Sequence, residues 1–259
     1  ATTTGLAIIQ LTDIFNICCP DFVVTIADRY ETLATAISAS YQNIPLVHLQ
    51  GGDVSGNIDD KVRNAITRLS EYHFPASEKS HKNLLNMGIA EEFIWMHGCP
   101  SMDLINDISS FKEFIRSTRN LKSLELKKYF LILLHPVTDK PKESIIILEN
   151  LIKALTHFKN SKFVIISPNV DAGSEEIRNF HTLSKNNKND NLLFVENIPP
   201  NKFLNLIRNS QICIGNSSSF LREAALCGVP ALILGSRQEG RELGNNCVVL
   251  KSPKEKDII

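Results

Sequence analysis

Short apolar runs alternate along the chain with longer stretches whose apolar residues recur at helical spacing. The runs are rich in Val, Ile, Leu and Phe, which is typical of strands buried in a parallel sheet. They cover residues 22–27, 45–49, 72–76, 93–97, 129–134, 162–166, 192–195, 211–215 and 230–234. The stretches that indicate helices cover residues 31–41, 59–72, 80–87, 144–158, 201–208 and 219–227. This alternation predicts an α/β protein in which helical crossovers connect parallel strands.

A polar, charged and helix-prone segment from Ile105 to Lys127 interrupts the alternation, which then restarts. We therefore predict two Rossmann-like lobes, residues 1–118 and 119–259. In open parallel sheets ligands bind beyond the carboxyl ends of the strands, so the loops that follow strands are the places to search. The chain begins with Ala1 inside a helical pattern and stops in a charged stretch, and we expect both ends to be cut rather than native.

Composition narrows the class of protein. Of 259 residues 43% are hydrophobic, and 28 Lys and Arg balance 28 Asp and Glu, so no overall field favours nucleic acid or an anionic membrane. The six cysteines form no CxxC pair and show no zinc-ligand spacing, which predicts reduced thiols and no metal site. Without a signal peptide or a membrane-spanning run, we expect a cytoplasmic protein.

The segment Gly215–Ser219, Gly-Asn-Ser-Ser-Ser, ends a predicted strand and opens a predicted helix. Backbone N–H groups, hydroxyls and the helix dipole together suit phosphate, although one serine could simply cap the helix. Glu223, further along, could accept hydrogen bonds from a ribose diol or be a solvated helix residue. Arg237 lies in a Gly-rich loop after the next strand and could clamp an anion.

Acidic residues follow the first two predicted strands. Asp28, beside Arg29, could act as a base or cap the next helix. After Gln50 and a pair of glycines, Asp59, Asp60 and Arg63 fall on the first turns of a helix, where Asp59 and Arg63 could also form an ordinary i,i+4 ion pair. His135 ends the first strand of the second lobe, where it could be structural or could transfer protons.

The ordered set of these motifs resembles the hydrolysing branch of the UDP-N-acetylglucosamine 2-epimerase family. The motifs are Ala27–Arg29, Gly51–Gly56, Ile58–Asp60 with Arg63, His135–Thr138, Asp171–Gly173, Gly215–Ser218, Arg222–Glu223, Gly235–Gln238 and Gly240–Glu242. The resemblance runs from about residue 21 to residue 246, nearly the whole chain. It implies a glycosyltransferase-B-like architecture with the active site between two lobes. It also implies a reaction that requires neither a metal nor another cofactor.

The same resemblance implies an activity and roles for particular residues. The activity is hydrolysis of UDP-N-acetylglucosamine to N-acetylmannosamine and UDP, by elimination of UDP and hydration of the resulting glycal, for sialic-acid-type sugars. On the UDP side it places Asn216, Ser217, Ser218, Glu223, Arg237 and Arg29. On the catalytic side it places Asp28, Gln50, Asp59, Asp60, Arg63 and His135. A homo-oligomer is also implied.

Two positions depart from the family pattern. Ala27 replaces the usual Gly, and Gln50 stands where most relatives carry a catalytic Glu; an amide cannot accept a proton in its place. The family's first strand and an Arg-bearing loop that touches UDP are absent, so the first lobe is expected to be incomplete. These departures leave open the same reaction on a UDP-diacetamido sugar, in a legionaminic-type pathway. They also leave open an inactive UDP-sugar-binding fragment. A non-hydrolysing epimerase stays a further alternative because such enzymes share the fold.

Overall fold

The structure, a computed structural model, describes residues 1–54, 58–118, 121–137, 141–168, 174–179 and 191–259. The Asp171–Gly173 motif, Ser55–Asn57 and Thr138 fall outside the described residues. The chain divides into two compact units. Unit 1 comprises residues 1–100 and 239–242, and unit 2 comprises residues 101–238 and 243–259. The lobe boundary expected after residue 118 stays a prediction.

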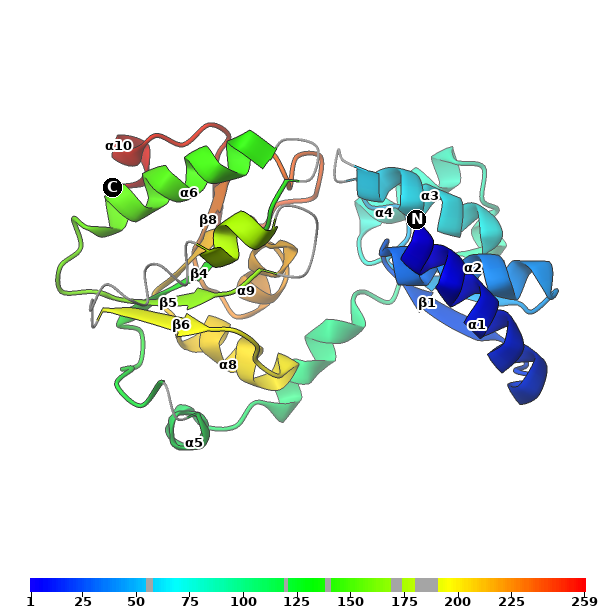
Figure 1. Ribbon diagram of the computed structural model, residues 1–259, viewed down its shortest axis with the longest axis horizontal. Helices are drawn as coiled ribbons and strands as arrows, with labels where there is room; N and C mark the ends of the chain where they lie inside the picture. The colour runs from blue at the N-terminus through cyan, green and yellow to red at the C-terminus, as the bar shows by residue number, and fades with distance from the viewer. Residues whose placement is uncertain (55–57, 119–120, 138–140, 169–173, 180–190) are drawn as a thin grey trace. The chain divides into compact units, whose positions relative to one another are not determined.

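Unit 1 is built on a three-stranded parallel sheet in the order β1-β2-β3. Figure 1 labels β1 and the helices α1 to α4 of this unit. Its elements are α1 (Thr2–Cys18), β1 (Val23–Ile26), α2 (Tyr30–Tyr41), β2 (Leu46–Leu49), α3 (Ile58–Leu69), β3 (Tyr72–Phe74), α4 (Glu78–Asn86) and the 3₁₀ helix η1 (Glu91–Phe93). β1 and β2 are each followed by a helix that returns to the start of the next parallel strand, as the alternation of patterns predicts.

Burial alternates along the strands of unit 1. Inward residues of the strands pack with α2 and α3 around Ala36, Ala39, Leu46 and Ile66. Helix α1 lies against α2, and Ser38 donates a hydrogen bond to the carbonyl of Ile8 across that contact (3.2 Å). The opposite face of the sheet is partly exposed and carries an apolar hollow of about 510 Å³. The hollow is lined by Asp21, Phe22, Pro45, Val47, Tyr72, Phe74, Trp95 and His97.

The prediction of a strand at residues 93–97 is wrong. The segment forms a single isolated β-bridge, between Ile94 and His73, after the 3₁₀ turn of η1. The apolar pattern in this segment instead reflects aromatic packing, since Trp95 stacks on Phe74 with ring centroids 5.6 Å apart. Gly98, with φ of 83°, then turns the chain away.

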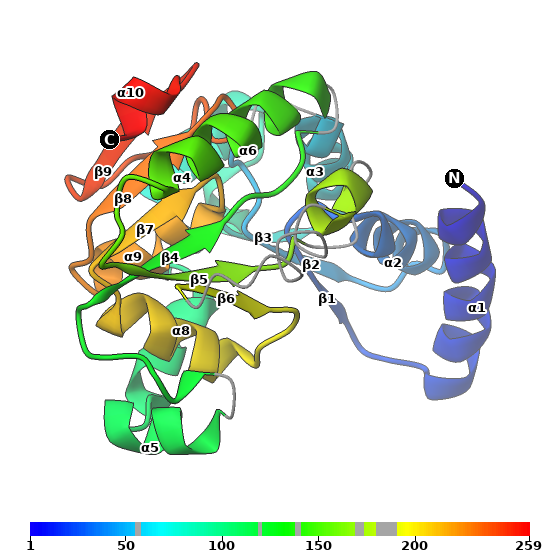
Figure 2. The ribbon, with the colours of Figure 1, turned by 60° about the vertical axis from the view of Figure 1, so that its left-hand side comes forward.

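Unit 2 contains a six-stranded parallel sheet in the order β6-β5-β4-β7-β8-β9, which Figure 2 shows clearly. The strands are β4 (Tyr129–Leu133), β5 (Lys162–Ile166), β6 (Leu192–Val195), β7 (Ile212–Gly215), β8 (Ala231–Leu234) and β9 (Cys247–Leu250). The named helices are η2 (Pro100–Asp107), α5 (Phe111–Ser117), α6 (Pro141–Leu155), α8 (Pro200–Asn209), η4 (Ser218–Phe220), α9 (Glu223–Leu226) and α10 (Glu255–Ile258). Parallel strands covered on both faces account for the continuous apolar runs of the sequence.

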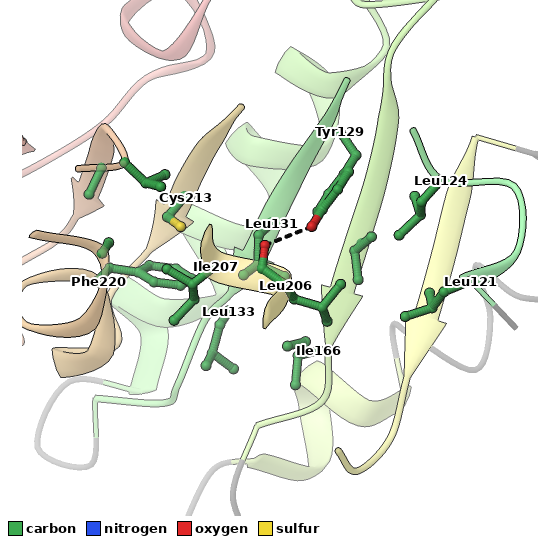
Figure 3. Packing of buried hydrophobic residues seen from close by; sticks show 14 of the residues in the cluster. Leu121, Leu124, Tyr129, Leu131, Leu133, Ile166, Leu206, Ile207, Cys213 and Phe220 are labelled. Atoms are coloured by element: carbon green, nitrogen blue, oxygen red, sulfur yellow. Dashed lines mark hydrogen bonds between the residues drawn. The ribbon is translucent and has the colours of Figure 1, made fainter. Parts of the chain in front are cut away.

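The central strand β4 is buried along its whole length and contributes side chains to two hydrophobic clusters, one on each face of the sheet. Tyr129, Leu131 and Leu133 pack in a cluster with residues of α8 and α9, whereas Phe130 and Ile132 pack in a cluster with residues of α6. The phenol of Tyr129 donates to the carbonyl of Leu206 on α8 (2.7 Å), so its polar end is satisfied inside the apolar cluster (Figure 3). Burial raises the pKa of the Tyr129 hydroxyl far above its ordinary value, which keeps it a neutral donor.

The sequence missed or misjudged three elements of unit 2. The helix predicted over residues 219–227 is split into the 3₁₀ turn η4 and the four-residue α9. Strand β9 was not predicted because its Val248 and Val249 are exposed and its apolar run is short. Helix α10 is a single turn near the chain end.

All six cysteines are free thiols, of which Cys99 and Cys213 are buried. Among the described residues, no helix is long and apolar enough to cross a membrane.

Candidate functional site

In unit 1 a buried arginine gathers the carboxylates singled out in the sequence. Asp28 lies in the turn after β1, and Asp60 and Arg63 lie in the first turns of α3. The Arg63 guanidinium pairs with the Asp28 carboxylate and, at 2.7 Å, with that of Asp60. The Arg63 side chain is 1% exposed, against 17% for Asp28 and 21% for Asp60. The guanidinium is therefore enclosed, while the two carboxylates reach the surface.

The backbone after β2 completes the surroundings of Arg63. Its Nη1 atom also donates to the carbonyl of Asp53 (2.7 Å), and the Asp53 carboxylate accepts a hydrogen bond from Ser80 of α4. Five donors in a fixed planar fork allow one guanidinium to hold several oxygens at once. Arg63 thus ties the turn after β1 to α3 and to the loop after β2.

The glycine pair after Gln50 serves close packing within the protein. A Cβ at Gly51 would lie 3.0 Å from Nδ1 of His48, and one at Gly52 would lie 2.2 Å from the carbonyl oxygen of Ser80. Gly52 also has φ of +81°, a left-handed conformation that side chains disfavour. The neighbours that this pair allows to approach belong to β2, α3 and α4.

Gly52→Ala should therefore lower the free energy of unfolding far more than Gly88→Ala. Gly88 has a similar φ of +79° but no atom within 4 Å of a Cβ. We expect about 1 kcal/mol for Gly88→Ala from conformation alone, and about 2 kcal/mol more for Gly52→Ala from the clash. Urea unfolding of both variants measures the difference, and equal losses would contradict the packing explanation.

Three further candidate residues lie in unit 1: Gln50 and Asp59 from the catalytic set, and Arg29 from the UDP set. Gln50 has a left-handed backbone (φ 63°), and its side-chain amide lies 3.0 Å from Sγ of Cys99. Asp59 is half-buried in the first turn of α3. Arg29, at the N-cap of α2, pairs with Glu31 at 3.1 Å in an exposed position. Their roles stay predictions.

In unit 2 one asparagine links the ends of two adjacent strands. Asn216 follows β7, and its side chain brackets the backbone of His135, which follows β4. Its Oδ1 accepts from the His135 N–H (2.7 Å) and its Nδ2 donates to the His135 carbonyl (2.8 Å). The carbonyl of Asn216 in turn accepts from Gln238 (2.7 Å) and from Arg237 (3.2 Å). The predicted residues His135, Asn216 and Arg237 are thus brought together.

The backbone can take this course because of Gly215. Its φ is +147°, and a Cβ there would lie 1.9 Å from the carbonyl oxygen of Leu133 on the neighbouring strand. Ser217 then accepts a hydrogen bond from the N–H of Ser219 (3.3 Å) and caps a 3₁₀ turn of three residues. Since the long helix expected here is absent, the helix dipole contributes less than the sequence suggested, and hydroxyls and cationic side chains matter more.

His135 is a neutral imidazole in this environment. Burial and, secondarily, the nearby Arg237 lower the pKa of His135 to about 3. Its Nδ1 atom is buried and has no hydrogen-bond partner in the described residues. A buried polar atom without a partner is rare in folded proteins. The residue that carries it, His135, is one of those that line a cavity.

That cavity, of about 590 Å³, lies at the carboxyl ends of β4, β5, β6 and β7. Its polar lining comprises His135, Ser167, Arg178, Glu196, Asn197, Ser217, Ser218, Ser219 and Arg237. The volume and the few converging polar groups are typical of a small-molecule site. Sequence reasoning pointed to loops after strands but did not name Ser167, Arg178, Glu196 or Asn197; applying the same rule to β5 and β6 could have found three of them.

Glu223, the predicted ribose ligand, lies at the start of α9. Its Oε1 accepts a hydrogen bond from Ser101 (3.3 Å), and its Oε2 is buried without a hydrogen-bond partner among the described residues. Arg222, beside it, donates to Ser218 at 3.4 Å. In the part of the chain that the structure describes, no group of three or more His, Cys, Asp or Glu side chains could hold a metal ion.

Two buried neutral histidines predict a loss of stability on acidification. Burial lowers the pKa of His48, in unit 1, to about 4, and that of His135, in unit 2, to about 3. The unfolded chain takes up these protons below about pH 6.5, and the folded chain does not. The free energy of unfolding should therefore fall by about 1.4 kcal/mol per pH unit for each histidine as pH drops from 6 to 5. Urea titrations at these pH values measure the free energy of unfolding. His157 is exposed, so the variant His157→Gln should show the same pH dependence as the wild type and serves as the control. A free energy of unfolding that stays constant between pH 6 and pH 5 would contradict the prediction.

Comparison with known proteins reveals clear similarities. The family model described as UDP-N-acetylglucosamine 2-epimerase matches residues 1–259. A UDP-N,N'-diacetylbacillosamine 2-epimerase (hydrolyzing) of Legionella pneumophila is 34% identical over 96% of this chain and 65% of its own length. A GDP/UDP-N,N'-diacetylbacillosamine 2-epimerase (hydrolyzing) of Campylobacter jejuni is 32% identical over 94% of this chain and 64% of its own length. A UDP-N-acetylglucosamine 2-epimerase of Neisseria meningitidis is 31% identical over 88% of this chain and 59% of its own length. The chain thus spans about three fifths to two thirds of these relatives.

Solved structures share the fold. The UDP-GlcNAc 2-epimerase of Methanocaldococcus jannaschii, in complex with UDP-GlcNAc and UDP, superposes with a TM-score of 0.81 at 22% identity, over 98% of this chain and 72% of that one. The Neisseria meningitidis enzyme bound to UDP-GlcNAc gives 0.79 at 20% identity, over 98% and 70%. At such identities the likeness establishes the fold, and it confirms the predicted α/β, glycosyltransferase-B-like class.

Proposed function

Since the chain belongs to the UDP-N-acetylglucosamine 2-epimerase family, we propose that it acts as a hydrolysing UDP-sugar 2-epimerase. The proposed reaction converts UDP-N-acetylglucosamine and water into N-acetylmannosamine and UDP. Three relatives with hydrolysing or N-acetylglucosamine 2-epimerase names, at 31 to 34% identity, support the reaction class. The product would serve the synthesis of sialic-acid-type sugars.

The observation that carries the proposal is the polar wall of the 590 Å³ cavity in unit 2. Arg237 and Arg178 supply positive charge, Ser217 and Ser218 supply hydroxyl donors, and His135 lines the same space. Such a set suits the diphosphate of a nucleotide sugar, and these groups would stabilise the negative charge that develops on UDP as it departs. Arg29 and Glu223 are further proposed UDP ligands.

The carboxylates around Arg63 are proposed to perform the proton transfers. A base removes the proton from C2 of the sugar, the C1–O bond breaks, and UDP leaves with that electron pair, which gives a 2-acetamidoglucal. Addition of water then returns a proton to C2 on the other face and places a hydroxyl on C1. Gln50 can orient the sugar but cannot accept a proton, so the base is sought among Asp28, Asp59 and Asp60.

A second substrate is favoured by a specific observation. Two of the similar relatives are named as diacetylbacillosamine 2-epimerases, at 34% and 32% identity, against 31% for the Neisseria meningitidis UDP-N-acetylglucosamine 2-epimerase. The same residues could act on a UDP-diacetamido sugar, because N,N'-diacetylbacillosamine differs from N-acetylglucosamine at C4, which carries an acetamido group, and at C6, which lacks the hydroxyl, whereas the reacting atoms C1 and C2 are the same. A cytoplasmic location and a homo-oligomer remain predictions.

Parallel kinetics on the two sugars decide between them. The full-length protein is assayed with UDP-N-acetylglucosamine and with UDP-N,N'-diacetylbacillosamine, and released UDP is measured. A higher kcat/KM for the first supports the proposal as stated, and a higher value for the second moves it to the diacetamido sugar. Binding of both without release of UDP would leave a UDP-sugar-binding protein and overturn the enzymatic proposal.

A further inference from the structure

His48 on β2 is a buried residue that neither the motifs nor the proposed chemistry uses. Its side chain is fully buried, and both ring nitrogens have partners. Nε2 lies 2.9 Å from the carbonyl oxygen of Ala27, in the turn after β1, and Nδ1 lies 3.1 Å from the hydroxyl of Thr67 on α3. A carbonyl oxygen only accepts, so Nε2 carries the hydrogen and Nδ1 accepts from Thr67.

The residue that His48 holds has an unusual backbone. Ala27 has φ of 62°, a left-handed conformation that is uncommon for a residue with a side chain. Its own N–H donates to the carbonyl of Leu49 (2.9 Å), so both polar groups of Ala27 are bound by β2. The conformation of Ala27 sets the direction in which the next residue, Asp28, leaves the strand.

Two side-chain contacts therefore meet at the step from Ala27 to Asp28. His48 binds the carbonyl of Ala27, and Arg63 pairs with the carboxylate of Asp28. Thr67 and Arg63 are one turn apart on α3, and both are buried. Gly51 leaves the space for this arrangement, since a Cβ there would lie 3.0 Å from His48 and 3.2 Å from Thr67.

We propose that His48 is a positioning residue, which, oriented by Thr67, fixes the Ala27–Asp28 peptide and so places the Asp28 carboxylate against Arg63. The catalytic consequence rests on the proposed function, whereas the structural consequence does not. Burial holds the pKa of His48 at about 4, so the neutral ring that this role needs is present at neutral pH.

The test compares three variants of the full-length protein. His48→Phe keeps a ring but removes both hydrogen bonds, His48→Gln retains a donor near the position of Nε2, and Thr67→Val removes the group that orients the ring. Because a misplacement of about 1 Å can cost on the order of 100-fold in rate, we expect His48→Phe to lower kcat by that order with little change in KM. His48→Gln should restore most of kcat, and Thr67→Val should fall between them.

His73→Phe is the matched control. His73 is also buried and pairs in register with His48, but its Nδ1 has no hydrogen-bond partner among the described residues. It should lose stability while its kcat per folded enzyme stays near the wild-type value. If His73→Phe lowers kcat as much as His48→Phe does, the effect is general loss of packing and the proposal is wrong.

Crystal structures of the variants separate this proposal from the proposed function. In His48→Phe, or in Thr67→Val if the former does not fold, Ala27 should leave the left-handed region and the pair between Asp28 and Arg63 should open. An unchanged turn and pair would overturn the positioning role whatever the activity. A wild-type protein inert on every UDP-sugar would overturn the proposed function while these structures still decide the role of His48.

Discussion

Arg63→Met should lower kcat by on the order of 100- to 1,000-fold and the free energy of unfolding by about 3 kcal/mol. In the wild-type protein the Arg63 guanidinium pairs with the carboxylates of both Asp28 and Asp60. The substitution leaves both carboxylates beside an apolar side chain. It also leaves the carbonyl of Asp53 without this donor. We expect a loss of unfolding free energy at the lower end of the range for breaking a buried ion pair, because both carboxylates are partly exposed.

Arg63→Lys and Arg68→Met complete this experiment. Lysine keeps the charge but not the planar fork, so it should recover stability better than turnover. Arg68 lies on the same helix, is exposed, and binds only the carbonyl of Met87 in the described contacts, so Arg68→Met should change kcat little. Urea unfolding and steady-state kinetics measure both quantities. Wild-type turnover in Arg63→Met would refute the assignment of this cluster to catalysis.

Asn216→Asp should weaken UDP binding by about 100-fold, which corresponds to about 2.7 kcal/mol. In the wild-type protein Nδ2 of Asn216 lies 2.8 Å from the carbonyl oxygen of His135. The substitution puts an oxygen in place of this donor, so two oxygens face each other. It also adds a buried negative charge near the proposed diphosphate site. Repulsion should displace His135, and the link to Arg237 through the Asn216 carbonyl should loosen with it.

Asn205→Asp is the matched control for this variant. Asn205 is also buried in unit 2 and donates to a backbone carbonyl, that of Ser109, at 2.8 Å. It should therefore lose a comparable free energy of unfolding, yet the folded protein should bind UDP as the wild type does. Isothermal titration calorimetry with UDP gives the comparison. Equal losses of affinity in the two variants would show that Asn216 acts through stability alone.

Much of the fold could be predicted because strands buried on both faces leave uninterrupted apolar runs. β4 is the clearest case, since all of its side chains are buried. The prediction failed where burial was partial, as in β9, or where apolar residues served aromatic packing, as around Trp95. The helix predicted after Gly215 failed because the backbone there turns in a 3₁₀ conformation before α9 begins.

Part of the candidate site, such as His135, Asn216 and Arg237, could be named from the sequence, but the contacts that connect its residues could not. The sequence predicted that Arg63 could pair with Asp59, one turn away on the same helix. The structure adds a partner that spacing could not show, Asp28, which lies 35 residues earlier in the chain. Asn216 and His135 are 81 residues apart, and only the pairing of β4 with β7 brings them together. Contacts of this kind depend on strand order, which periodicity does not contain. For the same reason the role of His48 was not visible in the sequence.

The most direct test of the proposed reaction is a proton-NMR time course of the full-length protein with UDP-N-acetylglucosamine in D₂O. The account predicts that UDP and free N-acetylmannosamine appear together and that the new sugar carries deuterium at C2, because the proton there is removed and replaced during elimination and hydration. Accumulation of UDP-N-acetylmannosamine would instead show a non-hydrolysing epimerase. N-acetylmannosamine that retains its original hydrogen at C2 would contradict the proposed proton transfers.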